Sequence, residues 1–535
     1  MGWWAATLER AGGPALGAAL LLVALSLGLY LHFTRHFAYW RRRGVPFVPP
    51  APFVGNVAPL FLLRRSIGGF ARDLYRALPE APAVGFWIFD KPALLIKKPE
   101  LVKKILVKDF GDFGDRYTDS DVHADPLGQR NLFVIKGELW KYLRINVSPL
   151  FTSGKMKKMF HLVVKCDEQM VEYINKAYEK EKNVTLDLKE VTAKCTTDVI
   201  SSCVFGINSN SLADPKAEFR EFGKKTFEYT FSRGLEVIVF FFAPFLVKYF
   251  KLSFFQKDAA TFLRKVFWDT IKAREESKTK RNDLIDLLIE LKNKGQIDHE
   301  VNDDDKDTDG ITADQKISKQ FDFSGDDLVA QAAIFFVAGF ETSASTMSFA
   351  LYELALQPDL QTRLRNEIRD EMKKSDGKIT YEMVFGMKYL DMVVSETLRK
   401  YPTLPFLDRV ALRDYHDDDT GISIEKGTPI FISLLGLHTD PKYHPNPDRF
   451  DPERFSDEGK RKHVPFTYLP FGEGPHNCIG MRFGLMSAKT GIVHILAKYE
   501  VQPSERTPIP LVLNKRGVVT TTIGGVPLKF NKLND

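Results

Sequence analysis

An uninterrupted apolar stretch near the N-terminus limits what this chain can fold into. Pro14 to Phe33 reads PALGAALLLVALSLGLYLHF and contains no Asp, Glu, Lys or Arg. A helix of about 20 apolar residues crosses a bilayer and satisfies its backbone hydrogen bonds internally, as lipid requires. Arg35 and the run Arg41 to Arg43 follow this stretch, which by the positive-inside rule places the rest of the chain in the cytosol. We therefore expect a membrane anchor over residues 1–34, because a cleaved signal peptide has a shorter apolar run and basic residues before it.

The rest of the chain predicts one globular body. Residues 35–60 are basic and rich in proline, which favours a stiff linker. Residues 61–535 contain long amphipathic patterns and no stretch that separates two cores, so we expect a single domain, mainly α with small β-sheets (α+β). Strand-like runs lie at 83–99, 428–438 and 508–513.

Charge and a second apolar stretch bear on the surroundings of this body. The run DHEVNDDDKDTD at 298–309 predicts a solvated acidic loop, and the formal net charge of the chain is nevertheless +6. A basic surface suits anionic lipid or an acidic partner protein. The stretch IVFFFAPFLVKYF at 238–250 is too short to span a membrane. It is either buried core or a loop that dips into the membrane.

A lone cysteine stands in the segment FGEGPHNCIG, residues 471–480. The four cysteines of the chain are scattered and form no CxxC pair, which argues against a disulfide framework and a zinc site. A lone thiolate serves as a nucleophile or as the axial ligand of a haem iron. Glycine at 472, 474 and 480 would let backbone approach a flat macrocycle, and Phe471 could shield the sulfur. The helical pattern that follows Cys478 would point N–H groups at the thiolate, so haem is favoured over a cysteine hydrolase.

This segment resembles the haem-binding loop F-x-x-G-x-x-x-C-x-G of cytochrome P-450 enzymes. Three further motifs of that family occur in the same order: AGFET at 338–342, ETLRKYP at 396–402 and FDPERF at 450–455. The resemblance covers nearly the whole chain after the anchor. The amino-acid sequences of the motifs are most similar to those of insect microsomal members, many of which oxidise foreign compounds. It implies a cytochrome P-450 domain that binds haem b, with Cys478 as the axial ligand of the iron.

The resemblance also implies roles for residues around the haem. Trp140, Arg144 and Arg409 would hold the haem propionates, and Phe471, Cys478 and Gly480 would form the loop beneath the ring. The family usually has arginine two residues before the cysteine, whereas this chain has His476. A histidine is often neutral at pH 7, so haem retention or potential would differ from that of relatives.

Two more motifs carry implied roles. Thr342 and Glu341, in a helix expected from about Ser324 to Leu356, would help deliver protons to dioxygen. The residues alone equally allow Thr342 to bond back to the Ala338 carbonyl and Glu341 to face solvent. Glu396 and Arg399 are spaced for a pair that would contribute little on a surface, and the resemblance adds Arg454 to form a buried structural triad.

These features predict a haem-thiolate monooxygenase on the cytosolic face of the endoplasmic reticulum. It would insert one oxygen atom of O2 into small lipophilic substrates such as xenobiotics, plant toxins, insecticides or endogenous lipids. The chain shows no fingerprint for a flavin or nicotinamide domain. We therefore expect electrons from NADPH through a separate membrane flavoprotein reductase, with cytochrome b5 as a further candidate partner, and no nucleic acid. The alternatives are a haem-thiolate isomerase or dehydratase that does not use O2, and a haem sensor or carrier without turnover.

Substrate contacts are expected from four poorly constrained regions. These are Phe113–Phe133, 226–250, Phe335–Phe340 and Thr403–Leu407, whose aromatic content suggests an apolar pocket.

Overall fold

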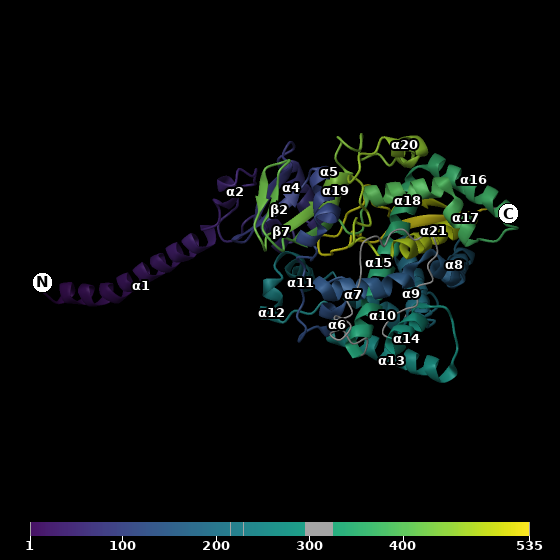
Figure 1. Cartoon of the computed structure of the whole chain (residues 1–535), viewed down its shortest axis with the longest axis horizontal. Helices are drawn as coiled ribbons and strands as arrows, with labels where there is room; N and C mark the ends of the chain where they lie inside the picture. The colour runs from purple at the N-terminus through teal and green to yellow at the C-terminus, as the bar shows by residue number, and fades with distance from the viewer. Residues whose placement is uncertain (1, 215, 228, 295–324, 534–535) are drawn as a thin grey trace.

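The computed structural model describes residues 2–214, 216–227, 229–294 and 325–533. The acidic run predicted at 298–309 lies outside these residues, as does Ser324. Helix α1 (Gly2–Thr34) extends away from a body that is mainly helical (Figure 1). Among the described residues, two helices are long and apolar enough to cross a membrane: Gly17–Thr34, of which no residue is buried, and Gly325–Leu356, which is 78% buried inside the protein. The first is therefore the candidate anchor and the second is a core helix. The fold class predicted from the sequence is confirmed.

The body contains twelve helices of nine or more residues in its described part, and several shorter ones. The longer ones are α4 (Ile67–Ala77), α7 (Gly137–Val147), α8 (Ser153–Lys180), α9 (Leu188–Val204), α10 (Glu218–Thr226), α11 (Phe231–Phe242), α13 (Lys257–Ser277), α14 (Leu284–Lys294), α15 (Gly325–Leu356), α16 (Pro358–Lys374), α18 (Lys388–Lys400) and α21 (Met481–Lys498). The shorter ones include α2 (Tyr39–Arg42), α3 (Ala58–Phe61), α5 (Pro99–Lys103), α6 (Pro126–Arg130), α12 (Phe245–Phe250), α17 (Tyr381–Gly386), α19 (Leu434–His438) and α20 (Asp457–Arg461).

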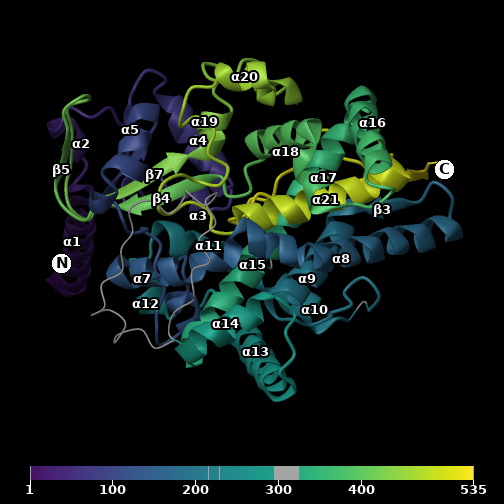
Figure 2. The same ribbon diagram turned by 45° about the vertical axis from the view of Figure 1, so that its right-hand side comes forward.

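Helix α15 runs through the centre of the helical part and packs against α6, α9 and α21 (Figure 2). Asp326 and Asp327 lie in its first turn, where carboxylates interact favourably with the helix dipole. Most of its side chains are apolar and buried around the whole circumference, as expected of a helix inside a core. The core of the helical part therefore forms around α15.

Three small sheets complete the body in the described residues. The largest has the order β1 (Ala83–Ile88), β2 (Lys91–Ile96), β7 (Pro429–Ser433), β4 (Phe406–Val410), with β2 and β7 parallel and the other pairs antiparallel. A second sheet has the order β3 (Thr185–Asp187), β9 (Pro527–Lys532), β8 (Tyr499–Pro503), and β5 (Tyr415–Asp417) pairs with β6 (Ile422–Ile424). The large sheet lies at the end of the body nearest α1 (Figure 1).

The strand predictions differ in outcome. The run at 83–99 contains β1 and β2, as predicted. The run at 428–438 forms strand β7 and then helix α19, so only its first half is extended. The prediction of a strand at 508–513 is wrong, because only Leu513 bridges to Thr522 there. Pro508 and Pro510 have no N–H to donate to a ladder.

The segment 35–60, predicted as a linker, packs against the large sheet. Trp40 is fully buried and its indole N–H donates to the Phe86 carbonyl at 3.3 Å. Val48 N–H donates to the Gly85 carbonyl at 3.0 Å. A Cβ at Gly85 would lie 2.5 Å from the Trp40 ring, so glycine permits this packing. The segment thus seats the end of α1 on the body.

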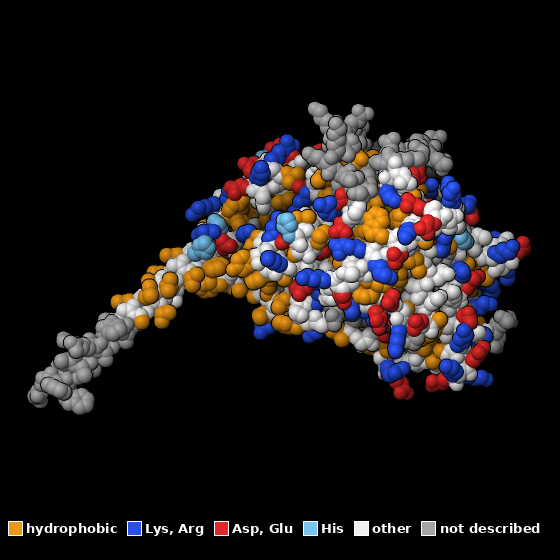
Figure 3. All heavy atoms as spheres, turned by 90° about the horizontal axis from the view of Figure 1, so that it is seen from below, with side chains coloured by type: hydrophobic (Ala, Val, Ile, Leu, Met, Phe, Trp, Pro, Cys, Tyr) orange, Lys and Arg blue, Asp and Glu red, His pale blue; other side chains and the backbone are white. Residues whose placement is uncertain are grey.

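The apolar stretch at 238–250 divides into two parts. The residues from Val237 to Ala243 are buried, so the core interpretation holds for them. In α12, Phe245, Tyr249 and Phe250 are exposed by 42%, 79% and 59%. Seen from below, hydrophobic side chains continue from α1 onto the adjoining face of the body (Figure 3). Ring contacts link this face, with Phe33 against Phe53 and Phe89 against Phe245.

Candidate functional site

The loop before α21 has a fixed shape around Cys478. Its N–H donates to the Phe471 carbonyl at 2.8 Å, and Asn477 N–H donates to the Gly474 carbonyl at 2.9 Å. Gly472 and Gly474 have φ of 70° and 73°, which side chains disfavour. A Cβ at Gly474 would also lie 2.0 Å from the Leu106 carbonyl oxygen. These glycines are therefore explained by the protein's own backbone.

Gly480, the N-cap of α21, is different. Its φ is −89°, and no described atom lies within 4 Å of where a Cβ would stand. Neither backbone conformation nor protein packing requires glycine here. A flat group seated against the loop would require it, which agrees with the macrocycle that the resemblance implies.

Cys478 differs from the other cysteines. Cys166, Cys195 and Cys203 are buried in the core, whereas Cys478 is accessible although the protein surrounds it. Burial raises the pKa of the Cys478 thiol, while the Gly480 N–H and the guanidinium groups of Arg144 and Arg116 lower it. These donors favour the thiolate, the form that ligates metals.

Guanidinium groups that are buried or half-buried converge near this loop. Arg144 donates to the Asn477 carbonyl at 3.0 Å and to the Asn477 side chain. Arg409, 1% exposed, donates to the Asp408 carbonyl at 2.7 Å, and its Nε has no partner. Burial, and then the neighbouring Arg116, lowers the pKa of Arg409 to about 9, and burial lowers that of Arg144 to about 10. The cluster therefore holds positive charge that the protein does not fully compensate.

The residues present fit a haem. The Asp408 carboxylate accepts from Arg116 at 3.3 Å and from the Thr118 N–H and hydroxyl, so it balances one of the three guanidinium charges. Two further negative charges would balance Arg144 and Arg409, and a haem b carries two propionates. The buried Nε atoms of Arg116 and Arg409 without partners are donors for such carboxylates.

His476 lies in the same cluster as a neutral ring. It packs on Trp140 with centroids 3.8 Å apart, and its Nε2 lies 2.6 Å from the Gly114 carbonyl oxygen. Burial lowers its pKa well below 6.5, and Arg409, Arg116 and Arg144 lower it further. The imidazole therefore donates from Nε2 and adds no charge to the cluster.

The middle of α15 presents a small accessible surface within an otherwise buried helix. Ala338 is exposed, Gly339 and Thr342 are half-buried, and the Thr342 hydroxyl donates to the Ala338 carbonyl at 2.6 Å. The helix is continuous through these residues. A Cβ at Gly339 would lie 2.4 Å from Ile200 and 3.9 Å from the ring of Phe483, which places this turn near the start of α21.

Glu341 does not face solvent, so that interpretation is wrong. It is 5% exposed, its Oε1 lies 2.9 Å from Lys189 Nζ of α9, and it accepts from the Tyr229 hydroxyl at 3.3 Å. Burial lowers the pKa of Lys189, while Glu341 raises it. Lys189 also donates to Ser345 at 3.0 Å. The acid next to Thr342 thus belongs to a buried polar network.

The three triad residues lie together and are nearly inaccessible. Arg399 donates twice to Glu396, from Nε at 2.7 Å and from Nη2 at 2.8 Å, and both side chains are fully buried. Arg454 Nε lies 3.4 Å from Glu396 Oε1. Arg399 also donates to the carbonyls of His438 and Pro447. The pair therefore joins α18 to the chain that leads to the cysteine loop.

The structure brings together aromatic residues of the regions expected to contact substrate. Phe241 of α11 meets Phe133 at 6.3 Å and Phe406 of β4 at 5.4 Å between ring centroids. Phe227 meets Phe340 of α15 at 5.4 Å. These contacts join all four regions named from the sequence.

Sequence reasoning missed Arg116, Lys189 and Tyr229. Arg116 binds a carboxylate 292 positions away, and Tyr229 binds one 112 positions away. The sequence around Arg116 and Tyr229 contains no motif that identifies them, because the carboxylate that each one binds comes from a distant element.

Comparison with known proteins shows which protein family this chain resembles. The family model described as Cytochrome P450 matches residues 45–528. Cytochrome P450 6k1 of Blattella germanica is 56% identical over 97% of this chain and 98% of its own length. Probable cytochrome P450 6g2 of Drosophila melanogaster is 42% identical over 96% and 98%, and cytochrome P450 6j1 of Blattella germanica is 41% identical over 96% and 97%. The similarity to insect sequences predicted from the motifs is confirmed.

Proposed function

Because the chain belongs to the cytochrome P450 family, whose members hold a haem iron through a cysteine thiolate, we propose that Cys478 is that ligand. We further propose that the protein inserts one oxygen atom of O2 into small lipophilic substrates. Electrons would come from NADPH through a separate flavoprotein reductase on the endoplasmic reticulum. The observation that carries this proposal is the meeting of one accessible cysteine with the buried Arg116 and Arg409 and the half-buried Arg144, three guanidinium groups that have a single bound carboxylate among the described residues.

Each group around this site has a task that follows from its chemistry. Arg116, Arg144 and Arg409 would bind the two propionates of a haem, and Trp140 packs on the neutral ring of His476 in the same cluster. Burial raises the pKa of the Cys478 thiol, and the Gly480 N–H, Arg144 and Arg116 oppose this and so favour the thiolate that ligates a metal. A bound haem-thiolate iron supplies the cleavage of the O–O bond of dioxygen.

Helix α15 supplies protons in this proposal. The Thr342 hydroxyl is anchored on the Ala338 carbonyl and is accessible, so it can receive and pass a proton. Glu341 is the nearest acid along the helix, and Lys189 and Tyr229 hold its carboxylate in place. The aromatic contacts of Phe133, Phe227, Phe241, Phe340 and Phe406 suit an apolar substrate and exclude water.

The test of the ligand is the carbon monoxide difference spectrum of the reduced protein. We expect Cys478→Ala to lose the thiolate-type spectrum completely. Cys166→Ala, Cys195→Ala and Cys203→Ala are matched controls and should retain it, since these thiols are buried elsewhere. A normal spectrum in Cys478→Ala would refute the assignment.

The test of the reaction is product formation from a panel of lipophilic compounds in membranes reconstituted with reductase. Turnover should require NADPH, reductase and O2 together. Turnover that persists without O2 would instead identify an isomerase or dehydratase.

A further inference from the structure

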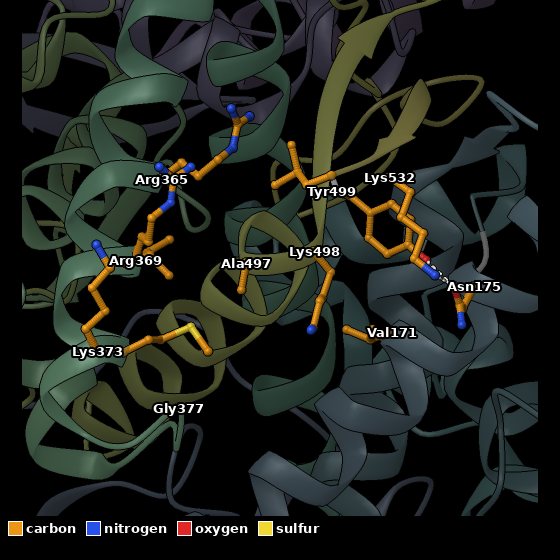
Figure 4. A pocket seen from close by; sticks show the side chains of 13 residues that line it. Val171, Asn175, Arg365, Arg369, Lys373, Gly377, Ala497, Lys498, Tyr499 and Lys532 are labelled. Atoms are coloured by element: carbon orange, nitrogen blue, oxygen red, sulfur yellow. Dashed lines mark hydrogen bonds between the residues drawn. The ribbon is translucent and has the colours of Figure 1, made fainter. Parts of the chain in front are cut away.

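A pocket is lined by α16 and the C-terminal end of α21. These elements lie at the end of the body opposite α1 (Figure 1). The pocket has a volume of about 590 Å³, and residues of α8, α16, the end of α21, β8 and β9 line it. Five of the lining side chains are cationic and none is acidic: Arg365, Arg369, Lys373, Lys498 and Lys532. Figure 4 shows these side chains around one hollow, with Arg365, Arg369 and Lys373 on one side and Lys532 beside Asn175 on the other.

Little in the described part of the chain compensates this charge. Arg369 and Lys498 are exposed and form no ion pair with any described residue. The Nε of Arg365 is buried without a partner, and its Nη2 donates to the neutral Gln361 side chain at 2.8 Å. Burial lowers the pKa of Arg365, Glu500 raises it, and Arg369 lowers it again. The positive charges therefore act on one another as well as on solvent.

The other two cations are only weakly held. Lys373 lies 3.7 Å from Asp370 in an exposed pair. Lys532 donates to the side-chain Oδ1 of Asn175 at 2.9 Å, and the Tyr499 hydroxyl donates to the same oxygen at 3.1 Å. With its oxygen engaged twice, the Asn175 side chain can offer only its NH2 group as a further donor. The cationic side chains and the Asn175 NH2 group that line this pocket thus suit an anion.

We propose that this pocket binds a small organic polyphosphate of the nucleoside diphosphate class. Two guanidinium groups and three ammonium groups match several phosphate charges, and arginine binds phosphate through two parallel N–H donors. Ile368, Met372 and Ala497 supply apolar wall for an organic body. The volume falls in the range of about 300–1,000 Å³ typical of small-molecule sites, which favours a compact ligand over an acidic protein surface.

The test is isothermal titration of ADP into the haem-loaded, full-length protein in detergent at low ionic strength. We expect ADP to bind, and the double variant Arg369→Gln/Lys498→Gln to bind at least tenfold more weakly. Arg369→Lys/Lys498→Arg keeps both charges and should retain most of the affinity. The control Lys278→Gln/Lys280→Gln removes the same charge from exposed positions between α13 and α14 and should bind ADP normally.

Inorganic pyrophosphate serves as the second probe. It should bind more weakly than ADP, because it cannot contact the apolar wall. The proposal fails if ADP does not bind, if the glutamine variant binds as tightly as the unaltered protein, or if pyrophosphate equals ADP. Tighter binding of a polyglutamate peptide than of ADP would assign the pocket to an acidic protein instead. The haem spectrum of each variant reports whether the fold is intact.

Discussion

The hydroxyl of Thr342 is anchored before any ligand arrives, since it donates to the Ala338 carbonyl within the same helix. Such back-bonding is common for threonine in helices and by itself implies no function. What distinguishes this residue is its place on the only accessible turn in the middle of α15 among the described residues, next to a buried acid held by Lys189. The accessibility of Thr342, rather than its hydrogen bond to Ala338, is therefore what makes it a candidate for proton transfer.

We predict that Thr342→Val uncouples electron consumption from product formation. Valine keeps the shape and removes the hydroxyl, so haem binding and substrate binding should persist. General acid catalysis typically contributes about 10²–10⁴-fold, and water can replace part of it. Product per NADPH should fall clearly while released peroxide rises, and Thr342→Ser should restore much of the coupling. Unchanged coupling in the valine variant would remove Thr342 from proton delivery.

His476 provides a second prediction at this scale. His476→Arg would place a fourth guanidinium beside Arg116, Arg144 and Arg409. Burial, and then the neighbouring Arg116, already lowers the pKa of Arg409. Two propionates would compensate that charge. We therefore expect haem to be held at least as tightly, and haem-free protein to be less stable by about 1–3 kcal/mol.

The measurement is the thermal midpoint with and without haem, together with the rate of haem transfer to an acceptor protein. The difference between the thermal midpoints with and without haem should be larger in His476→Arg than in the unaltered protein. It should be smaller in His476→Phe, which keeps a ring against Trp140 but adds no charge. Faster haem loss from the arginine variant would show that the loop is built around the histidine.

The sequence predicted only part of the site. Cys478, Glu396 and Arg399 stand in short motifs whose spacing has a local meaning, so they could be named from the sequence. Asp408 and Arg116 meet only after β4 is placed in the large sheet beside the loop that follows α5. Burial of Glu341 depends on α9 lying against α15. Contacts between distant elements leave no pattern in one chain.

At the scale of elements, long periodic helices were predictable and short irregular pieces were not. Helix α15 was expected within one residue of its described start and at its observed end, because a long apolar helix has a strong signature. The stretch at 238–250 is apolar in both halves apart from Lys248, yet its α11 residues are buried whereas Phe245, Tyr249 and Phe250 of α12 are exposed. The chain changes direction at Ala243 and Pro244, and composition cannot show which half then faces the core.

We predict that α12 is a second membrane contact. Without residues 1–34 the protein should still bind vesicles, and Phe245→Ser/Tyr249→Ser/Phe250→Ser should release it to the soluble fraction. Burying one such side chain contributes about 1.5–3 kcal/mol, so three can hold the protein reversibly.

Ile509→Ser/Val512→Ser is the control, because these residues are exposed on a loop next to Tyr352 at the far end of α15. Vesicle flotation measures both variants. Complete release of the truncated protein with an intact α12 would mean that α12 does not enter the membrane.

The whole molecule is a globular body from which one long helix, α1, extends. The exposed apolar faces of α1 and α12 lie on one side, and the basic pocket lies at the other end (Figures 1 and 3). Basic residues directly after α1 predict that the body is cytosolic. This arrangement leaves the end that carries the pocket in water.

Two Asn-x-Ser/Thr sequences test this orientation, and the structure separates them. Asn146 is buried and donates to the Tyr142 carbonyl, so a glycan there would conflict with the fold on either side of the membrane. Asn183 is exposed between α8 and β3 and could accept one only in the lumen. We predict no glycan at Asn183, and an unchanged mass after glycosidase treatment of protein expressed in insect-cell membranes. A mass shift that Asn183→Gln removes would reverse the orientation.

The small sheet of β3, β9 and β8 can form only late in the synthesis of the chain. Asp187, at the end of β3, accepts a hydrogen bond from the Val526 N–H, 339 residues later. A ribosome that adds about 5–20 residues per second needs roughly 20 to 70 seconds to make that stretch. Throughout this interval β3 has no partner strand, while the anchor has already emerged and can hold the nascent chain at the membrane. Residues translated long after β3 thus close the sheet that β3 begins, so a ribosome that stalls between the two leaves β3 with an open strand edge.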